Sequence, residues 1–487
     1  MADKTDEKKV TPRSQDFAAW YNDIILKAEL ADYSPVRGCM VIRPDGFGMW
    51  EALRDELDRR IKRTGARNAY FPLFIPQSFL QKEAEHVEGF APELAVVTHG
   101  GGKELEEPLV VRPTSETIIN HMFAQWIRSH RDLPLMVNQW CNVVRWEMRT
   151  RLFLRTSEFL WQEGHTAHTT REEAERETLT MLEVYRSFVE EFLAIPLVFG
   201  RKSAAQRFPG AVETYAIEGL MGDGRALQCG TSHFLGQNFA KAFETRYLDD
   251  SNQLQLVWQT SWGVSTRLIG AIIMAHGDDQ GLRLPPNVAS TQAVVVPIWR
   301  KADEGDKVLG AARAAFEALE KAGIRARLDT REGVTPGFKF NDWEMRGVPI
   351  RIEIGPRDVA SGEAVLARRD KSGPEAKTKA SLAGIEGHVQ KLLGEIQQSL
   401  FAQAKAASDS NTREFSDYES LKKQMEGEGG GGFAVVYWCE NPACEEKIRV
   451  DTRATCRVIG LNQNVASGKC IVCGESAAER AHFAKAY

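Results

Sequence analysis

The segment RWEMRTRLFLRTSEFLWQEGH at 145–165 places the strongest constraint on how this chain can fold. It contains arginines at four closely spaced positions, 145, 149, 151 and 155, and Phe159 and Trp161 follow them. Guanidinium groups at this density need anionic partners or open solvent, and the adjacent rings favour a flat base beside a polyanion. Neither GxxxxGK[ST] nor a GxGxxG after a strand occurs, so we expect an ATP site without a glycine-rich phosphate loop. The alternative, a solvated basic loop, explains the arginines but leaves FLWQEGH unexplained.

Composition sets only wide limits on function. The length of 487 residues predicts about three domains. The formal net charge of −5 means that any binding of nucleic acid must depend on local basic clusters. No apolar run is long enough for a transmembrane helix, and the N-terminal MADKTDEKKV lacks an apolar signal core. We therefore expect a cytoplasmic protein with no membrane partner.

The cysteines predict a zinc module near the C-terminal end. In the cytoplasm the 8 cysteines are expected to be reduced. Two closely spaced pairs match a tetrahedral four-cysteine zinc site: Cys439 with Cys444, and Cys470 with Cys473. Such a zinc is expected to be structural, because four protein ligands leave no open position; four unrelated free thiols are the alternative. Cys456 has no obvious partner, and three others are interpreted as buried small hydrophobic residues: Cys39, Cys141 and Cys229.

The chain divides into four predicted segments. They are an N-terminal arm at 1–37, a mixed helix and strand domain at 38–286, an α/β domain at 290–405 and the cysteine module at 433–487. LPPNVAS at 284–290 and the glycine-rich EGEGGGG at 426–432 are interpreted as linkers. The arm contains a short amphipathic helix, FAAWYNDIILKAEL, expected to pack on the main body.

Periodicity predicts the main elements. One helix carries Leu53, Leu57 and Ile61 on one face, ends at Gly65 and is followed by a strand-like NAYFP. A second helix is expected from Ser115 to about residue 130. The α/β domain is predicted to contain, in order, strand QAVVVPI, helix VLGAARAAFEALEKAG, strand RARLD, helix GFKFNDWEMRG, strands PIRIEIG and GEAVLARR, and a long helix to about 405.

Two further segments carry polar groups at helix starts. In VRPTSET at 111–117, Thr114 and Glu116 could hold an ammonium or imino group. On this segment alone we favour a plain helix cap by Thr114 or Ser115. In TSWGVSTRLIGAIIMAHGDD, Arg267 lies in the first turn of a helix, where the dipole opposes a cation. That position suggests a phosphate partner, with a buried salt bridge as the alternative.

Together these segments resemble the catalytic domain of class II aminoacyl-tRNA synthetases. The helix with NAYFP is similar to motif 1, which ends in a proline, here Pro72; RWE and RTSEF are similar to motif 2, and the Arg267 segment to motif 3. PTSET, LRTSEFLWQEGHT, QCGTSHFLGQNFA and GVPIRIEIGPRD are similar to prolyl-tRNA synthetases of the archaeal/eukaryote-like type, over residues 15–487. The resemblance implies an α+β fold: a catalytic domain on an antiparallel sheet, an α/β anticodon-binding domain and a four-cysteine zinc module.

The resemblance implies ATP-dependent activation of L-proline to prolyl-adenylate and transfer to the 3′ end of tRNA(Pro). Mg²⁺ would neutralise the departing pyrophosphate, and no side-chain nucleophile is required. Assigned to ATP and catalysis are Arg145, Glu147, Arg155, Thr156, Phe159, Gln228, Thr231, Ser265 and Arg267. Assigned to proline are Thr114, Glu116, Arg145, Trp161, Glu163, His165 and His233.

The resemblance extends to tRNA binding and assembly. Four residues would read guanine edges of the anticodon, with ordinary surface charge as the alternative for each: Glu344, Arg351, Arg357 and Asp358. Motif 1 implies a homodimer, although the stripe at Leu53, Leu57 and Ile61 would equally suit the core of a monomer. In relatives the terminal tyrosine, here Tyr487, points back toward the catalytic domain.

Other functions are less consistent with the sequence. A non-catalytic paralogue acting as a tRNA-binding or regulatory protein should have lost some of the motif arginines or Glu147, yet all are present. A zinc-dependent nucleic-acid-binding protein leaves motif 2 without a purpose, and in threonine or serine enzymes a zinc would lie in the active site rather than at 439–473. The stretch between His165 and Thr260 is too short for a large editing insertion, so we expect weak alanine misactivation, because a methylene contributes only about 1–3 kcal/mol to discrimination.

Overall fold

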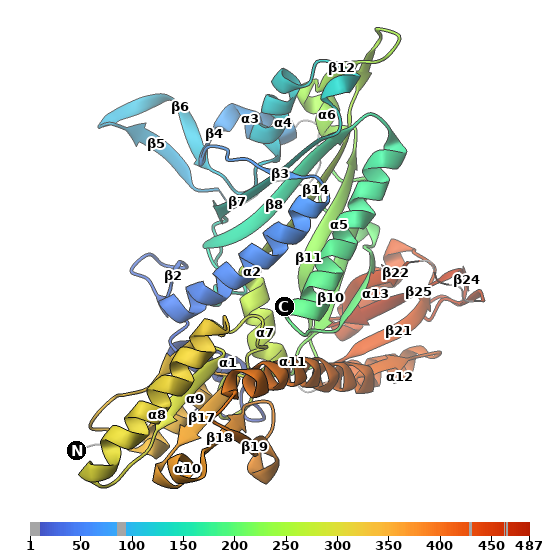
Figure 1. Ribbon diagram of the computed structural model, residues 1–487. Coiled ribbons are helices and arrows are strands. Elements are labelled where there is room, and N and C mark those ends of the chain that lie inside the picture. Colours follow the sequence, from blue (N-terminus) through green and yellow to red (C-terminus); the bar gives the residue numbers. More distant parts are fainter. Residues whose placement is uncertain (1–9, 85–93, 428–430, 462, 464–465) are drawn as a thin grey trace.

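One large sheet forms the centre of the molecule (Figure 1). The structure, a computed structural model, describes residues 10–84, 94–427, 431–461, 463 and 466–487, so parts of the predicted arm and of the glycine-rich segment 426–432 lie outside it. The 11 strands of the large sheet pair in the order β20-β21-β25-β22-β9-β10-β11-β14-β8-β7-β3. All neighbours are antiparallel except β20–β21 and β3–β7. The strands from the catalytic segment are β3 (Arg67–Asn68), β7 (Leu135–Val144), β8 (Glu158–His168), β9 (Leu197–Arg201), β10 (Glu213–Leu220), β11 (Ala226–Gly236) and β14 (Trp258–Ser265).

Two long helices, α2 (Pro44–Arg63) and α5 (Arg171–Phe192), lie across one face of this sheet (Figure 1). The predicted stripe of α2 is buried in the core of the chain itself, with Leu53, Leu57 and Ile61 at most 2 % exposed. The stripe therefore gives no support to a dimer. The other helices of this part are α1 (Phe17–Lys27), α3 (Gln77–Ala84), α4 (Glu116–Trp126), α6 (Asn238–Phe243) and α7 (Arg267–His276). The small strands are β1 (Ala31–Tyr33), β2 (Met40–Ile42), β4 (Phe74–Pro76), β5 (Val96–Gly100), β6 (Lys103–Val111), β12 (Arg246–Leu248) and β13 (Leu254–Leu256).

Two predicted elements of this part are shorter than expected. Only Asn68 of NAYFP belongs to a strand, because the chain then leaves the sheet edge toward β4. The helix expected to reach about residue 130 ends at Trp126, where Ile127 takes extended backbone angles and is buried with Phe123. Packing of Ile127 thus overrides the helical periodicity that the sequence suggested.

The α/β domain has a five-stranded sheet in the order β16-β15-β17-β18-β19. All of its predicted strands and helices are present; the short helix α10 was not predicted, and β19 was missed because KTKAS has little apolar pattern. Its long helix continues to Ser410. Its elements are β15 (Ala293–Pro297), α8 (Ala302–Lys321), β16 (Ala326–Leu328), α9 (Pro336–Met345), β17 (Ile350–Ile354), α10 (Pro356–Ser361), β18 (Glu363–Arg368), β19 (Lys377–Ser381) and α11 (Ile385–Ser410).

The segment 284–290 that joins this domain to the catalytic part is not a loose linker. Leu284 and Val288 are buried in the main core. Ion pairs cross the same boundary, with Arg346 Nη1 at 2.8 Å from Asp45 and Arg369 Nη2 at 2.6 Å from Asp278. The two parts are therefore held together by packing and by charge.

The C-terminal module extends the catalytic sheet. Strand β22 pairs with β9, and a Cβ on Gly200 would lie 2.0 Å from the Ile459 carbonyl oxygen, so this approach requires glycine. The elements of the module are β20 (Thr412–Glu414), α12 (Tyr418–Met425), β21 (Phe433–Trp438), α13 (Pro442–Thr452), β22 (Thr455–Gly460), β23 (Gly468–Lys469), β24 (Ser476–Ala477) and β25 (Glu479–Ala484). Tyr487 lies against the catalytic part, as expected, and its hydroxyl donates to Asp223 at 2.6 Å.

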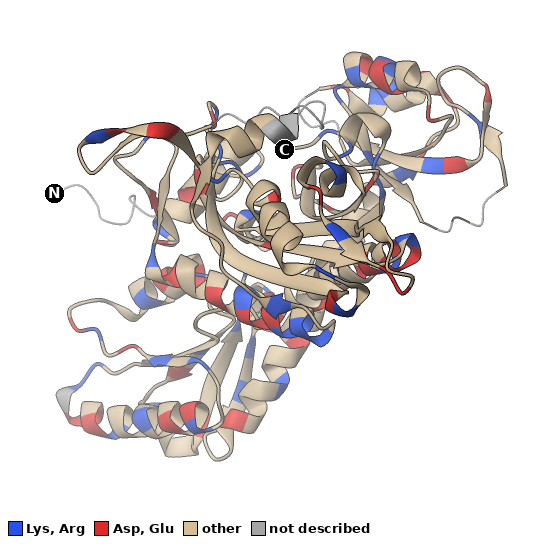
Figure 2. Ribbon diagram, turned by 90° about the horizontal axis from the view of Figure 1, so that it is seen from above, with Lys and Arg blue, Asp and Glu red and all other residues tan. Residues whose placement is uncertain are grey.

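Charged residues of both signs alternate along the outer helices, whereas the central strands are largely uncharged (Figure 2). No helix in the described residues is long and apolar enough to cross a membrane.

Candidate active site

Cross-strand register gathers the predicted site residues on one face of the central strands. Side chains at alternate positions of a strand share a face, so Trp161, Glu163 and His165 of β8 point to the same side. In β14, Ser261 pairs with His165 of β8 and with His233 of β11. Residues far apart in sequence therefore form a row across three strands, at the centre of the sheet.

These rows line a cavity of about 490 Å³. Every residue assigned to ATP or proline from the sequence lies in its wall: Thr114, Glu116, Arg145, Glu147, Arg155, Thr156, Phe159, Trp161, Glu163, His165, Gln228, Thr231, His233, Ser265 and Arg267. The structure thus brings together all residues predicted for the two ligands in one place.

Thr114 and Glu116 form a buried polar pair rather than a helix cap. The Thr114 hydroxyl donates to Glu116 Oε2, and both side chains are at most 4 % exposed. Ser115 begins α4, but its side chain makes no capping bond; its Oγ donates to Glu163 Oε1 at 2.5 Å instead. The preferred interpretation of this segment as a plain cap is therefore wrong, because the Thr114 hydroxyl bonds to the nearby Glu116 and the Ser115 hydroxyl to the distant Glu163.

Glu163 is held ionised at the base of the cavity. Burial opposes its charge, but hydrogen bonds from His165 (3.1 Å), Ser115 and Gln139 (2.8 Å) outweigh burial and lower its pKa. For His165 burial favours the neutral ring, yet the bond to Glu163 and the charges of Glu116 and Glu163 raise the pKa. The contact between the two side chains therefore fixes the orientation of the imidazole.

Arg145 is the best-placed free cation of the cavity. Its Nε donates to the Pro113 carbonyl at 2.9 Å, and its guanidinium lies 5.2 Å from the centre of the Trp161 ring and 5.7 Å from that of Phe159. Its terminal nitrogens have no hydrogen-bond partner within the described part of the chain, so they are available for a ligand.

Two more arginines face the same space. Arg155 Nε lies 3.4 Å from Glu147, and Arg267 Nε donates to the Leu154 carbonyl at 3.4 Å. Among the described residues Arg267 forms no salt bridge, so that alternative is not realised. Three guanidiniums in one cavity, of which Arg155 pairs with Glu147, match a polyphosphate.

The connection between β9 and β10 supplies a wall that sequence reasoning missed. Residues Gln206 to Pro209 line the cavity, and the Phe208 ring lies 4.6 Å from the His233 ring. Burial, followed by the charge of His165, lowers the pKa of His233 to about 3, so its ring is neutral. The stretch RKSAAQRFPG has no motif-like spacing, and only the adjacent Arg207 and Phe208 hinted at a site.

Comparisons with known proteins agree with this geometry. The family described as "tRNA synthetase class II core domain (G, H, P, S and T)" matches residues 97–276, "Anticodon binding domain" matches 292–396, and "Prolyl-tRNA synthetase, C-terminal" matches 418–487. The chain is 54 % identical to a proline–tRNA ligase of Roseiflexus castenholzii, over 98 % of this chain and 99 % of the relative. The chain belongs to the prolyl-tRNA synthetase family.

Similar prolyl-tRNA synthetases also occur in eukaryotes. The chloroplastic/mitochondrial proline–tRNA ligase of Arabidopsis thaliana is 55 % identical over 99 % of this chain and 89 % of the relative. A crystal structure of prolyl-tRNA synthetase from Cryptosporidium parvum, complexed with halofuginone and AMPPNP, superposes with a TM-score of 0.94 at 39 % identity. The superposition covers 99 % of this chain and 100 % of the Cryptosporidium chain, so the predicted class II fold is confirmed.

Among the cysteines of this synthetase, Cys141 is not the buried hydrophobic residue that was predicted. It is half-buried behind the cavity wall, where it accepts a hydrogen bond from Trp161 Nε1 at 3.2 Å and donates to Glu163 at 3.5 Å. Burial and the charge of Glu163 raise its pKa to about 12. Cys39 is also half-buried, whereas Cys229 is buried as predicted. Cys456 is buried in the core of the C-terminal module.

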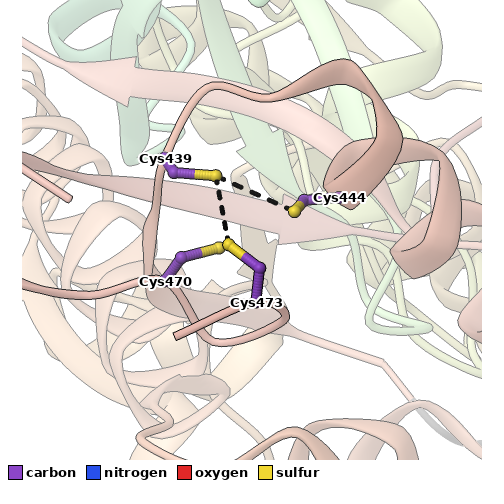
Figure 3. Close-up of side chains that lie close together, drawn as sticks. All are labelled: Cys439, Cys444, Cys470 and Cys473. Atoms are coloured by element: carbon purple, nitrogen blue, oxygen red, sulfur yellow. Dashed lines mark hydrogen bonds between the residues drawn. The ribbon is translucent and has the colours of Figure 1, made fainter. Parts of the chain in front are cut away.

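Four cysteines of the C-terminal module converge as the spacing predicted (Figure 3). Their sulfurs all lie within 4.8 Å of one another, and Cys439 Sγ is 3.8 Å from Cys444 Sγ and 3.7 Å from Cys473 Sγ. Sulfurs bound tetrahedrally at about 2.3 Å to zinc lie about 3.8 Å apart. The donor set and spacing therefore fit zinc.

The α/β domain has a second cavity, of about 320 Å³, which contains two of the predicted anticodon residues. Arg351 Nη1 donates to Glu344 at 2.8 Å, and Arg351 also contacts Glu353. Arg357 and Asp358 are not in the wall: they lie in α10, beyond the other end of β17, and Asp358 accepts the Gly355 N–H at the start of that helix. Four cations line this cavity but were not assigned: Arg368, Arg369, Lys371 and Lys377.

Proposed function

We propose that this chain is a proline–tRNA ligase, which activates L-proline with ATP and transfers it to tRNA(Pro). The observation that carries the proposal is one cavity whose wall contains Arg145, with free terminal nitrogens, together with the buried acids that act on its charge and with Arg155 and Arg267. A carboxylate and a triphosphate bound at the two ends would meet at Arg145. That is the geometry needed for attack of a carboxylate on the α-phosphate.

Arg145 would hold the α-phosphate together with the carboxylate of the amino acid, and stabilise the charge that builds up during adenylate formation. Arg155 and Arg267 would bind the outer phosphates, and the exposed face of Phe159 suits an adenine ring. Mg²⁺ would supply charge neutralisation on the phosphates. The remaining wall residues would complete the nucleotide site: Glu147, Thr156, Gln228, Thr231 and Ser265.

The buried end of the cavity suits a cyclic secondary amine. Proline presents two N–H donors as an ammonium, and the buried Glu116 with Thr114 offers matching acceptors. Trp161, His165 and His233 would enclose the ring. Glu163 has its oxygens occupied by other side chains, so it would orient His165 rather than bind the amine.

Proline-dependent exchange of pyrophosphate into ATP tests the activity directly. We expect strong exchange with proline and weak exchange with alanine across the standard amino acids, because alanine lacks only a small part of the apolar ring contact. No exchange with any amino acid, together with retained tRNA binding, would instead indicate the non-catalytic alternative. Complete absence of alanine turnover would contradict the predicted misactivation.

Glu344 and Arg351 are proposed to read guanine in the anticodon, in the cavity that they line. Arg351→Ala should raise the KM for tRNA about tenfold or more, since a bidentate contact with a base contributes about 1–3 kcal/mol. Exchange without tRNA should stay unchanged. Arg357→Ala is the matched variant, and an equal effect of both substitutions would show that the cavity is not the reading site.

Assembly and zinc binding complete the proposal. Exposed apolar side chains lie near the outer sheet edge and suit a homodimer, which light scattering would measure. Their exposed fractions are 73 % for Tyr70, 44 % for Phe74, 45 % for Val96 and 44 % for Trp126.

The four cysteines of the C-terminal module would hold a structural zinc. We retain the divisions 1–37, 38–286, 290–405 and 433–487 as proposed domains, and propose a cytoplasmic location.

A further inference from the structure

The β9–β10 loop, defined as residues 202–212, connects the wall of the proposed proline pocket to the C-terminal module. Its far part lines the cavity through Arg207 and Phe208. The Phe208 N–H donates to Thr214 Oγ1 at 3.0 Å, and Thr214 Oγ1 lies 3.0 Å from His233 Nδ1. This loop therefore places the Phe208 ring against His233, which β11 holds in the central sheet.

The start of the loop is fastened to the module by a buried contact. Ser203 Oγ donates to Glu445 Oε1 at 2.8 Å; Ser203 is fully buried and Glu445 is 6 % exposed. Glu445 lies in the first turn of α13, in the cysteine module. The contact joins residues far apart in sequence and brings a carboxylate out of water to meet a hydroxyl, with the charge of Lys202 nearby.

A buried ion-pair cluster beside it fixes the neighbouring residue. Glu218 of β10 is fully buried and receives Lys202 Nζ at 2.6 Å. From the module, Arg457 of β22 donates to both oxygens of Glu218, at 2.8 and 3.0 Å. Lys202 and Ser203 are thus both tied, directly or through Glu218, to the C-terminal module.

Stability alone does not explain this arrangement. A buried charged cluster often stabilises a fold less than apolar side chains of the same size would, whereas its directional bonds define one geometry. The module already has apolar packing and strand pairing with β9 to hold it in place. The charges are better explained by the need to place the loop.

We propose that Ser203 and Glu445 are positioning residues for the amino-acid pocket, through which the C-terminal module holds the β9–β10 loop against His233. The proposal rests on the proposed function, because it takes the end of the cavity beside His233 as the proline site. Neither residue touches the substrate. Loss of their contact should let Arg207 and Phe208 move, and thereby weaken proline binding while the nucleotide end is unaffected.

Ser203→Ala and Glu445→Ala test the proposal in the full-length protein. Each should raise the KM for proline roughly three- to tenfold, with the KM for ATP unchanged within about twofold. In the double variant the effects should not add, because each substitution already removes the same bond. Glu446→Ala is the matched control, since Glu446 is the next residue of α13 and pairs with the exposed Arg449.

Calorimetric proline binding, thermal unfolding and zinc content separate positioning from general damage. The expected result is weaker proline binding with unchanged zinc content. An unchanged KM for proline in both single variants, or a parallel rise of both KM values in each, would overturn the proposal. If unaltered protein shows no proline-dependent exchange, the proposed function fails instead. Ser203→Ala removes one oxygen and is expected to fold, so the test does not depend on the Glu445 variant.

Discussion

Arg145→Ala is expected to lower the rate of proline-dependent pyrophosphate exchange by about 10³-fold or more. Removal of one preorganised donor to a developing anion already costs about 10²–10³-fold in kcat, and Arg145 offers a fork of donors in a cavity with few competing partners. Exchange at saturating ATP and proline measures the effect. Arg145→Lys should lose most of the rate as well, because an ammonium keeps the charge but lacks the planar fork.

Arg149→Ala provides the matched control for this experiment. Arg149 lies in the same arginine-rich segment but is exposed and does not line the cavity. Its replacement should leave tRNA-independent exchange within about twofold. If Arg145→Ala retains exchange within tenfold of the unaltered protein while its unfolding temperature is unchanged, Arg145 does not contact the reacting groups.

The residues that could be predicted from sequence are those whose chemistry restricts their type. Arginines such as Arg145 and Arg267 were assigned because a polyphosphate would need cations, and the paired cysteines because their spacing suits a metal. Resemblance to a family then supplied the order of these segments along the chain. The structure places all the proposed ATP and proline residues in the wall of one cavity, which is consistent with these assignments.

Residues that act through tertiary contacts could not be predicted in the same way. Ser115 has the sequence environment of a helix cap, yet its hydroxyl goes to Glu163, which is far along the chain. No local pattern distinguishes a capping bond from the bond to Glu163, because either one gives the Ser115 hydroxyl a hydrogen-bond partner. Arg351 and Arg357 look equivalent in GVPIRIEIGPRD. In the structure Arg351 lies near the start of β17, whereas Arg357 lies in α10, beyond the other end of that strand.

The joining of the C-terminal module to the catalytic sheet was equally invisible in the sequence. A glycine at 200 has many possible reasons, and only the register shows that β22 lies against it. Paired cysteines suggested an autonomous module. The structure instead makes it the continuation of a sheet that carries the cavity, so its stability bears on the active site.

Removal of zinc is expected to have the largest effect on stability. Structural zinc contributes an apparent free energy of about 10–16 kcal/mol in small zinc-finger peptides at neutral pH, which is comparable with the whole stability of many domains, and here it would add to the packing around Trp438 and Phe483. Cys444→Ser should abolish zinc binding, and calorimetry should show an early unfolding transition from the module. Metal analysis of purified protein should give one zinc per chain before the substitution and none after it.

Cys456→Ala is the matched control, because Cys456 is buried in the same module but lies outside the four-sulfur cluster. It should retain zinc and lose only the modest stability of a small buried side chain. Full zinc content and an unshifted transition in Cys444→Ser would contradict a four-cysteine site.

Loss of zinc should also weaken proline binding more than ATP binding, since β22 of the module is hydrogen-bonded to β9, and the β9–β10 loop lines the cavity. Equal loss of both would mean that the module supports the catalytic domain only as a whole.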